Sequence, residues 1–235
     1  MFDLRLGDWR AVLGDVVADA LIADPPFGAA THSHHNASAK GHREAGKEAP
    51  PTRRALNYDP WTVDDVNEFV DAWAPRVRGW FCVMTSHDLV AAYRSALSRQ
   101  GRYVFPPLPC VIRGMNIRLG GDGPSGWTIY LVVARPRTRE FSTWGTLPGA
   151  YIARPRRKGR IGGKPRDLML EIVRDYSRPG DLVVDPCAGY GTTLRAAELL
   201  GRRAVGAEID PATHAIAVGS APWTNDEPQQ ALWGD

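Results

Sequence analysis

The sequence is poor in the features that mark secreted, zinc-binding and membrane proteins. Its 235 residues include three cysteines, at positions 82, 110 and 187, and this spacing favours neither a disulfide framework nor a zinc site. No apolar run approaches the roughly 20 residues that a membrane-spanning helix needs. The first residues, MFDLR, are not a basic segment followed by an apolar one, as in a signal peptide. These absences predict a soluble, cytoplasmic protein.

Acidic residues are missing from one stretch of the chain. Residues 151–166, YIARPRRKGRIGGKPR, contain seven Lys or Arg and no Asp or Glu, whereas the other 219 residues carry 22 basic and 26 acidic side chains. A positive charge concentrated in one place suits a phosphate backbone. The alternative is a solvated loop.

Short aliphatic segments alternate with helical patterns along the chain. Strands are predicted at residues 3–6, 20–23, 80–84, 103–104, 129–134, 182–184 and 204–207. Helices are predicted at 64–77 after an N-cap at Thr62, at 86–100 starting with Ser86, and at 166–176, 192–200 and 211–218. This order predicts one α/β domain over residues 1–235, with a mostly parallel sheet and helices on both faces.

Two stretches interrupt that pattern. Residues 29–58 are polar and predict a long, mobile loop of the kind that is either functional or disordered. His32, His34 and His35 lie in it, but a full set of metal ligands at suitable spacing is missing, so no metal site is predicted. Residues 135–164 are rich in Arg, Pro and Gly and are interpreted as a basic insert.

The motif DPPF, residues 24–27, follows the apolar run ALIA directly. Two consecutive prolines end a strand, and they stand between a carboxylate and an aromatic ring. Taken alone, the motif fits a turn. The other interpretation is a pocket for a flat, polar molecule that carries an amine.

The second motif is DLVVDPCAGYGTT, residues 181–193. A strand that ends in Asp185 and leads through glycines into a helix lets a ligand approach the backbone and the helix N-terminus. The next strand ends in Glu208, where nucleotide-binding α/β folds place an acid that accepts hydrogen bonds from ribose hydroxyls. A surface acid before the helix at Pro211 is the alternative.

Together these motifs resemble those of the DNA amino-methyltransferases. DPCAGYGTT with AEID is similar to the family's S-adenosylmethionine-binding motifs, and DPPF is similar to its catalytic motif. Residues 162–186, GGKPRDLMLEIVRDYSRPGDLVVDP, resemble the Lys-Pro motif and the helix that precede the cofactor strand. The motif order matches the family's β arrangement, which implies a circularly permuted, Rossmann-like methyltransferase fold. Strand 3–6 would then supply the sheet strand that is missing after Glu208.

The resemblance also implies a set of residues at the cofactor, S-adenosylmethionine. Asp8 would lie near its adenine, unless it only caps the next helix. Lys164 would contact its carboxylate or, alternatively, DNA, and Thr192 and Thr193 would offer hydroxyls or cap their helix. The full set of expected cofactor residues is Asp8, Asp24, Lys164, Asp185, Pro186, Ala188, Gly189, Gly191, Thr192, Thr193 and Glu208.

The four residues of DPPF are the expected catalytic residues. An exocyclic base amine is a poor nucleophile that lies inside the duplex, so the base must be flipped out and held. Asp24 and the carbonyl of Pro25 would accept its two N–H groups, Pro25 and Pro26 would fix the backbone, and Phe27 would stack on the base. Asp in the first position of the motif favours adenine N6 over cytosine N4.

The expected partner is double-stranded DNA, and the sequence leaves open whether the protein is a homodimer. The basic insert is the candidate target-recognition region, and the loop 29–58 would lie near the active site. Cytosine N4 methylation, methylation of RNA or protein glutamine, and a non-catalytic nucleic-acid-binding protein remain alternatives. The residues expected to bind DNA are Arg154, Arg156, Arg157, Lys158 and Arg160.

Overall fold

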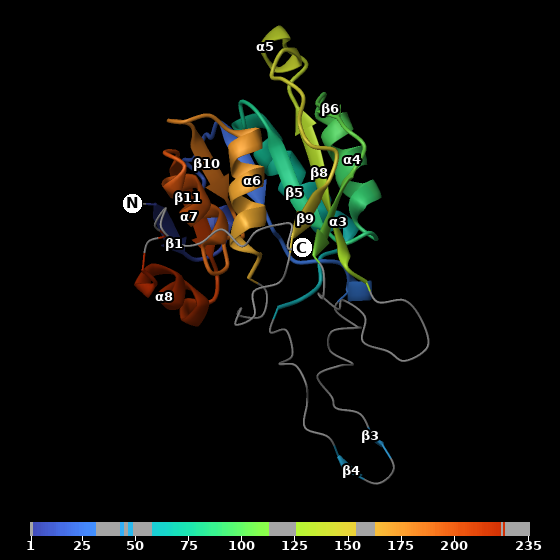
Figure 1. Cartoon of the computed structure of the whole chain (residues 1–235), viewed down its shortest axis with the longest axis vertical. Coiled ribbons are helices and arrows are strands. Elements are labelled where there is room, and N and C mark those ends of the chain that lie inside the picture. The colour runs from blue at the N-terminus through green and yellow to red at the C-terminus, as the bar shows by residue number, and fades with distance from the viewer. Residues whose placement is uncertain are drawn as a thin grey trace, which may run out of the picture.

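The computed structural model describes residues 2–31, 43–44, 47–48, 58–112, 126–153, 163–221 and 223. Their main feature is a nine-stranded sheet in the order β1-β11-β10-β2-β5-β8-β7-β9, with β6 paired to β8 (Figure 1). A short antiparallel pair, β3 and β4, stands apart. The strands are β1 Asp3–Leu6, β2 Ala20–Ala23, β3 Arg43–Glu44, β4 Lys47–Glu48, β5 Phe81–Thr85, β6 Tyr103–Val104, β7 Leu108–Ile112, β8 Thr128–Arg135, β9 Tyr151–Ala153, β10 Leu182–Asp185 and β11 Arg203–Glu208.

Five neighbouring strands, β1, β11, β10, β2 and β5, run parallel to one another. The long β8 is antiparallel to β5, β6 and β7, and β9 is parallel to β7. The N-terminal strand β1 forms the edge of the sheet beside β11, with Leu6 opposite Glu208. The predicted α/β sheet and its N-terminal edge strand are therefore confirmed.

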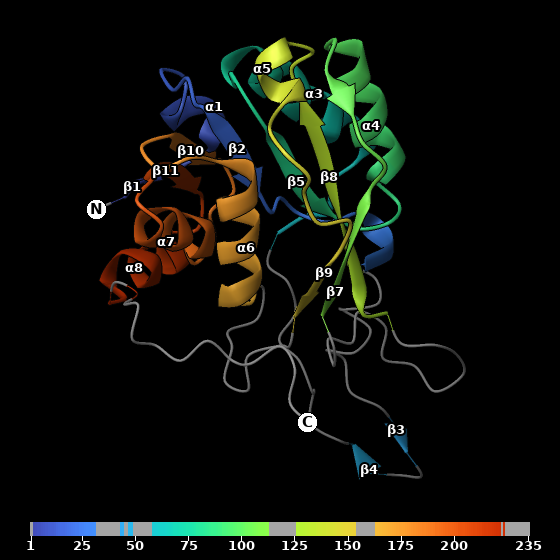
Figure 2. The same cartoon turned by 45° about the horizontal axis from the view of Figure 1, so that its top comes forward.

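Helices cover both faces of the sheet, as Figure 2 shows. One face packs against α1, α3 and α4 and the other against α6 and α7, and each side has its own cluster of buried residues. On β5, Phe81 and Val83 point to the first cluster, while Cys82 and Met84 point to the second. Burial on both faces explains the aliphatic strand sequences. The helices are α1 Trp9–Val12, α3 Val63–Trp73, the 3-10 turn η1 Ala74–Arg76, α4 Val90–Arg99, α5 Arg139–Ser142, α6 Arg166–Tyr176, α7 Thr192–Leu199 and α8 Pro211–Gly219.

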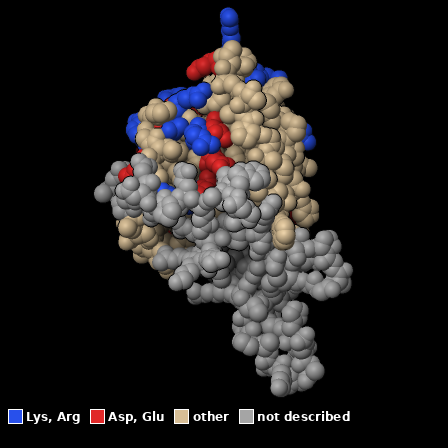
Figure 3. All heavy atoms as spheres, viewed as in Figure 1, with Lys and Arg blue, Asp and Glu red and all other residues tan. Residues whose placement is uncertain are grey.

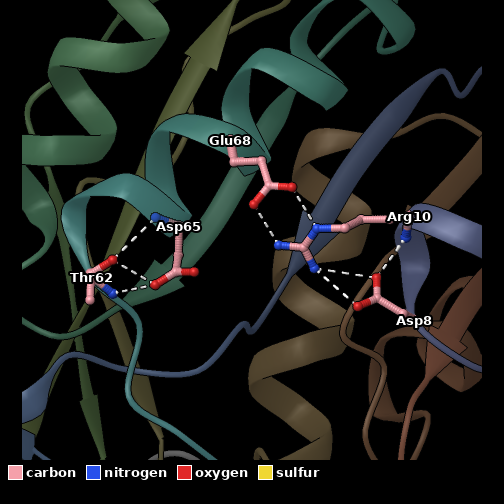
Figure 4. A network of polar contacts seen from close by, with 5 residues as sticks. All are labelled: Asp8, Arg10, Thr62, Asp65 and Glu68. Atoms are coloured by element: carbon pink, nitrogen blue, oxygen red, sulfur yellow. Dashed lines mark hydrogen bonds and ion pairs between the residues drawn. The ribbon is translucent and has the colours of Figure 1, made fainter.

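The two predicted N-caps have different outcomes. Thr62 caps α3 in a reciprocal capping box: its backbone N–H donates to Asp65 Oδ2 at 2.8 Å, and its hydroxyl accepts from the Asp65 N–H at 3.3 Å (Figure 4). The prediction that Ser86 starts the next helix is wrong, because α4 begins at Val90. The Ser86 hydroxyl instead accepts the backbone N–H of Gly28 at 3.0 Å, and so supports the turn after DPPF.

Strands β7 and β9 were not predicted from the sequence. Strand β7 contains Pro109, which weakens any strand pattern, and the three-residue β9 lies inside the stretch interpreted as a basic insert. The Tyr151 hydroxyl on β9 donates to Asp175 Oδ2 on α6 at 2.9 Å. The indole N–H of Trp144 donates to the Asp175 carbonyl at 2.9 Å. Part of residues 135–164 therefore packs onto the core.

Within the part of the chain that the structure describes, none of the helices has the length and apolar character required to cross a membrane.

Candidate active site

Four acidic side chains follow, or end, four neighbouring parallel strands. Asp24 comes directly after β2, Asp185 and Glu208 end β10 and β11, and Asp8 lies two residues beyond β1. Because parallel strands end at the same edge of a sheet, this order places the four acids in a row at the carboxyl edge, where α/β proteins bind ligands. Such a row favours a positively charged ligand.

Asp24 is a largely buried carboxylate with one free acceptor. Its side chain is 19% exposed, and Oδ2 accepts from the ammonium of Lys164, whose side chain is 12% exposed. Oδ1 is buried and has no hydrogen-bond partner among the described residues. Burial raises the pKa of Asp24, although the positive charge of Lys164 opposes that rise. The carboxylate is thus set up to accept a further N–H group.

The backbone of DPPF is held in place from two sides. Trp61 donates its N–H to the Phe27 carbonyl at 3.1 Å, and Gly28 pairs with Trp61 in a parallel bridge. Pro25 is buried, and no donor in the described ranges bonds its carbonyl. The motif therefore presents two acceptors, the Asp24 carboxylate and the Pro25 carbonyl, on a fixed backbone.

Lys164 lies against the DPPF motif. Besides its ion pair with Asp24, its Nζ lies 4.9 Å from the centroid of the Phe27 ring. The residue immediately precedes Pro165 and α6. Lys164 lies 140 positions after Asp24 in the sequence, and the fold brings it into contact with both Asp24 and Phe27. The expected contact with the cofactor's carboxylate stays a prediction.

Asp185 is the most buried of the four acids, with 1% exposure. Burial raises its pKa to about 7, against the hydrogen bonds that it receives from the Thr193 side chain and the Cys187 N–H. Asp24 and Glu208 raise it further through their negative charges. The negative charges of Asp24 and Glu208 thus reach Asp185, in keeping with the row of strand ends.

The glycine turn after Pro186 has the backbone that the motif predicts. Gly189 and Gly191 have φ values of 51° and 74°, in the left-handed region. A Cβ atom built on Gly189 would have no described atom within 4 Å, so the turn faces open space. Gly191 occupies the N-cap position of α7 without a side-chain cap. Thr192 and Thr193 therefore do not cap the helix, and Thr193 bonds Asp185 instead.

Glu208 and Asp8 both have partners in their own loops. The Asp210 N–H donates to Glu208 Oε1 at 2.7 Å, and burial raises the pKa of Glu208. The cap of α8 is Asp210, so Glu208 is free of that role. Asp8 does cap α1, and it also pairs with Arg10, which is bonded to Glu68 (Figure 4). The capping role of Asp8 is thus present, and its expected contact with adenine stays a prediction.

Two residues of the site were missed in the sequence. Burial raises the pKa of Tyr58 to about 12, and the negative charges of Asp24 and Glu208 add to that rise, which indicates that its phenol lies near both acids. Nothing in the polar sequence around Tyr58 signals this. Gly206 on β11 is the second: a Cβ there would lie 2.7 Å from the Asp185 carbonyl oxygen and 3.1 Å from Ala188 Cβ. Its signal, a glycine inside an aliphatic strand, is visible in the sequence.

The residues expected to bind DNA, Arg154, Arg156, Arg157, Lys158 and Arg160, lie outside the described residues, as do His32, His34 and His35. The segment with the five basic residues leaves the sheet at Ala153 and returns at Gly163, next to Lys164. Since β9 is parallel to β7, and β7 runs in the direction of β5, Ala153 lies at the same edge as Asp24. Of the described residues that flank this segment, Ala153 thus lies at the carboxyl edge of the sheet, and Gly163 directly precedes Lys164, which contacts Asp24.

On the face shown in Figure 3, the described surface carries both positive and negative side chains. In Figure 3, Lys and Arg side chains lie among Asp and Glu side chains in the region of α6. Neither this view nor the sequence of α6 gives a continuous basic surface from the described residues. Among those residues, no three His, Cys, Asp or Glu side chains are grouped so as to hold a metal ion.

Comparisons with solved structures support the fold. An M1.HpyAVI–SAM complex superposes with a TM-score of 0.64 at 19% identity, covering 93% of this chain and 98% of that one. PvuII DNA methyltransferase, described as cytosine-N4-specific, superposes with a TM-score of 0.59 at 14% identity, covering 94% and 87%. At these identities the likeness concerns the fold, which both proteins share with this chain.

Comparisons of sequence concern parts of the chain. The type II methyltransferase M.MjaI of Methanocaldococcus jannaschii is 36% identical over 74 residues, which are 32% of this chain and 24% of that protein. The match thus spans about a quarter of the curated relative's length. A family model described as DNA methylase, of the N6/N4 type, matches residues 148–219, from β9 through the glycine turn to α8. Residues 148–219 are thus similar to the N6/N4 DNA methylases, and the fold of the whole chain is that of the solved methyltransferases.

Proposed function

We propose that this protein transfers a methyl group from S-adenosylmethionine to an exocyclic amine of DNA, and that the acceptor is N6 of a flipped adenine. One observation carries the proposal: Asp24, with an unpartnered buried acceptor, stands in the same row of strand ends as Asp185 and Glu208. The match of residues 148–219 to the DNA methylase family model and the fold support a transferase of this kind.

The glycine turn and the carboxylates beside it fit S-adenosylmethionine. That molecule carries a positive sulfonium and an ammonium group, which a row of carboxylates attracts. Asp185 and the turn through Gly189 and Gly191 would hold its methionine portion, and Glu208 its ribose. The open space beside Gly189 leaves room for a ligand against the backbone. When bound, the cofactor supplies the methyl group and leaves as a neutral thioether.

On the acceptor side, Asp24 and the Pro25 carbonyl would each accept one N–H of the target amine. The amine nitrogen becomes tetrahedral and positive as it gains the methyl group, so both hydrogen bonds strengthen in the transition state. Because Pro25 and Pro26 restrict the backbone and Trp61 and Ser86 hold it, the acceptors need no rearrangement at that moment. The Phe27 ring would stack on the base, by analogy worth about 1–3 kcal/mol.

The choice of adenine rests on the aspartate at the first position of the motif. The fold does not separate the two bases, since a cytosine-N4-specific enzyme shares it. Cytosine N4 is therefore the second candidate. For DNA contact we propose the basic segment, with Arg154, Arg156, Arg157, Lys158 and Arg160, because its flanking residues lie at the active-site edge.

Expression in a bacterial host without DNA methylation tests this function. Plasmid DNA from cells with the wild-type protein and from cells with Asp24→Ala is read by single-molecule sequencing. We expect N6-methyladenine in one short motif, only with the wild type. Modified cytosine would change the assigned target from adenine N6 to cytosine N4. Unmodified DNA from cells that express the wild-type protein well would contradict the proposed DNA methylation.

A further inference from the structure

The ammonium of Lys164 lies against the two groups of DPPF that the proposed function assigns to the target base. It contacts the Asp24 carboxylate and lies 4.9 Å from the centroid of the Phe27 ring. This distance is within the range of a cation–π interaction. The same carboxylate would accept an N–H of the target base, and the same ring would stack on it. The Lys164 side chain thus contacts both the Asp24 carboxylate and the Phe27 ring.

We propose that Lys164 is a positioning residue that keeps Asp24 charged through Oδ2 and so leaves Oδ1 as the acceptor for the target amine. The proposal rests on the proposed function and adds to it a group that the family motif leaves open between cofactor and DNA. The ammonium pairs with one oxygen of the carboxylate, and the base amine bonds to the other.

Burial makes such a partner necessary. A carboxylate removed from water is costly unless it is paired, and otherwise it takes up a proton. A protonated Asp24 would donate a hydrogen bond and no longer accept one. Burial already raises the pKa of Asp24, and the charge and hydrogen bond of Lys164 counter that shift. Lys164 thereby preserves the acceptor that the reaction needs.

The other ionisable groups around Asp24 cannot replace Lys164. Asp185 on β10 adds negative charge, and the remaining groups are phenols and thiols whose pKa values are raised, so they are neutral at pH 7. These groups, each of which interacts electrostatically with Asp24, are Tyr58, Tyr93 on α4, Cys110 on β7 and Cys187 after β10.

The backbone at Lys164 is anchored while its side chain is long. Pro165 is buried and directly precedes α6, which is fixed by buried Leu168 and Ile172. Gly163, on the other side, is exposed. The lysine side chain has a flexible four-carbon stem, so its ammonium can stay on the Asp24 carboxylate without movement of α6.

The test is the pH dependence of methyl transfer to plasmid DNA from a methylation-free host, with tritiated S-adenosylmethionine. Lys164→Met and Lys164→Gln remove the charge, and Lys164→Arg keeps it. Arg78→Met is the matched control for loss of a surface charge, since Arg78 is 69% exposed and precedes β5 at the opposite edge. Thermal unfolding verifies that each variant is folded.

We expect the acid limb of the rate profile of Lys164→Met and Lys164→Gln to move up by at least one pH unit. Their activity would fall at least tenfold at pH 6.5 and return to within threefold of the wild type near pH 9, while Lys164→Arg and Arg78→Met keep the wild-type profile. Folded Met and Gln variants with an unshifted profile, or with equal losses at every pH, would overturn the role of Lys164. Absence of methylation by the wild type would instead overturn the proposed function.

Discussion

The Asp8 carboxylate accepts a hydrogen bond of 2.8 Å from the backbone N–H of Arg10, and this bond caps α1 at the edge of the candidate active site. The same carboxylate forms an ion pair of 3.1 Å with the Arg10 guanidinium, in which both side chains are about 40% exposed. An exposed pair of this kind contributes little to stability. The cap is therefore the main structural role of Asp8.

Two substitutions at Asp8 separate the cap from a contact with the cofactor. Asn is as good an N-cap as Asp, whereas Ala costs about 0.5–2 kcal/mol. We expect Asp8→Ala to lower the free energy of unfolding by that amount and Asp8→Asn to leave it nearly unchanged, as measured by urea denaturation. If Asp8 also contacts the cofactor, calorimetry will show weaker S-adenosylmethionine binding by Asp8→Asn. Unchanged binding would assign Asp8 to the cap alone.

Asp185 makes stability depend on pH. Its pKa is about 7 in the folded protein and about 3.9 in an unfolded chain, so the native state holds a proton that the unfolded state has lost. The free energy of unfolding should therefore decrease as pH rises from about 4 to about 7, by up to about 1.4 kcal/mol per pH unit. Asp24 and Glu208, whose pKa values are also raised, act in the same direction.

Asp185→Asn removes one of these contributions. We expect the variant to be more stable than the wild type at pH 8, with a flatter pH dependence between pH 4 and 7, in denaturation experiments without ligand. Asp64→Asn, at an exposed position in the first turn of α3, is the control. If the free energy of unfolding of Asp185→Asn falls with pH as steeply as that of the wild type, Asp185 is not a buried titrating carboxyl.

Gly206 is required for the approach of β11 to the glycine turn. A Cβ there would come within 2.7 Å of the Asp185 carbonyl oxygen, a backbone atom that cannot move independently of β10. Gly206→Ala should lower the free energy of unfolding by about 1–3 kcal/mol and weaken S-adenosylmethionine binding. Gly14→Ala is the matched control, because its Cβ would meet no atom within 4 Å. Equal stability of the two variants would show that the strands tolerate the added methyl group.

Much of the sheet could be predicted because its strands are buried on both faces. Such strands are short aliphatic runs, and those at 20–23 and 182–184 lie where they were expected. Strands β7 and β9 escaped prediction because Pro109 interrupts one and the other has three residues, so their pairing with β8 and α6 decides their conformation. Tertiary contacts of this kind leave no periodic pattern.

The candidate site was predictable where backbone chemistry dictates the residue. Glycines at 189 and 191 adopt the left-handed conformation that the motif requires. The ion pair of Lys164 with Asp24 and the place of Tyr58 were not predictable, because each joins segments that only the fold brings together. Ser86 was misassigned for the same reason: its hydroxyl bonds Gly28 on a distant segment.

The most direct test of the account compares cofactor binding and methyl transfer in Asp24→Ala. Calorimetry with S-adenosylmethionine and transfer of a tritiated methyl group to unmethylated plasmid DNA are measured on the same purified samples of wild type and variant. Since Asp24 acts on the target amine, we expect binding within about threefold of the wild type and a loss of transfer of at least about 100-fold, as when one transition-state hydrogen bond is removed. Retained transfer in Asp24→Ala would contradict the account.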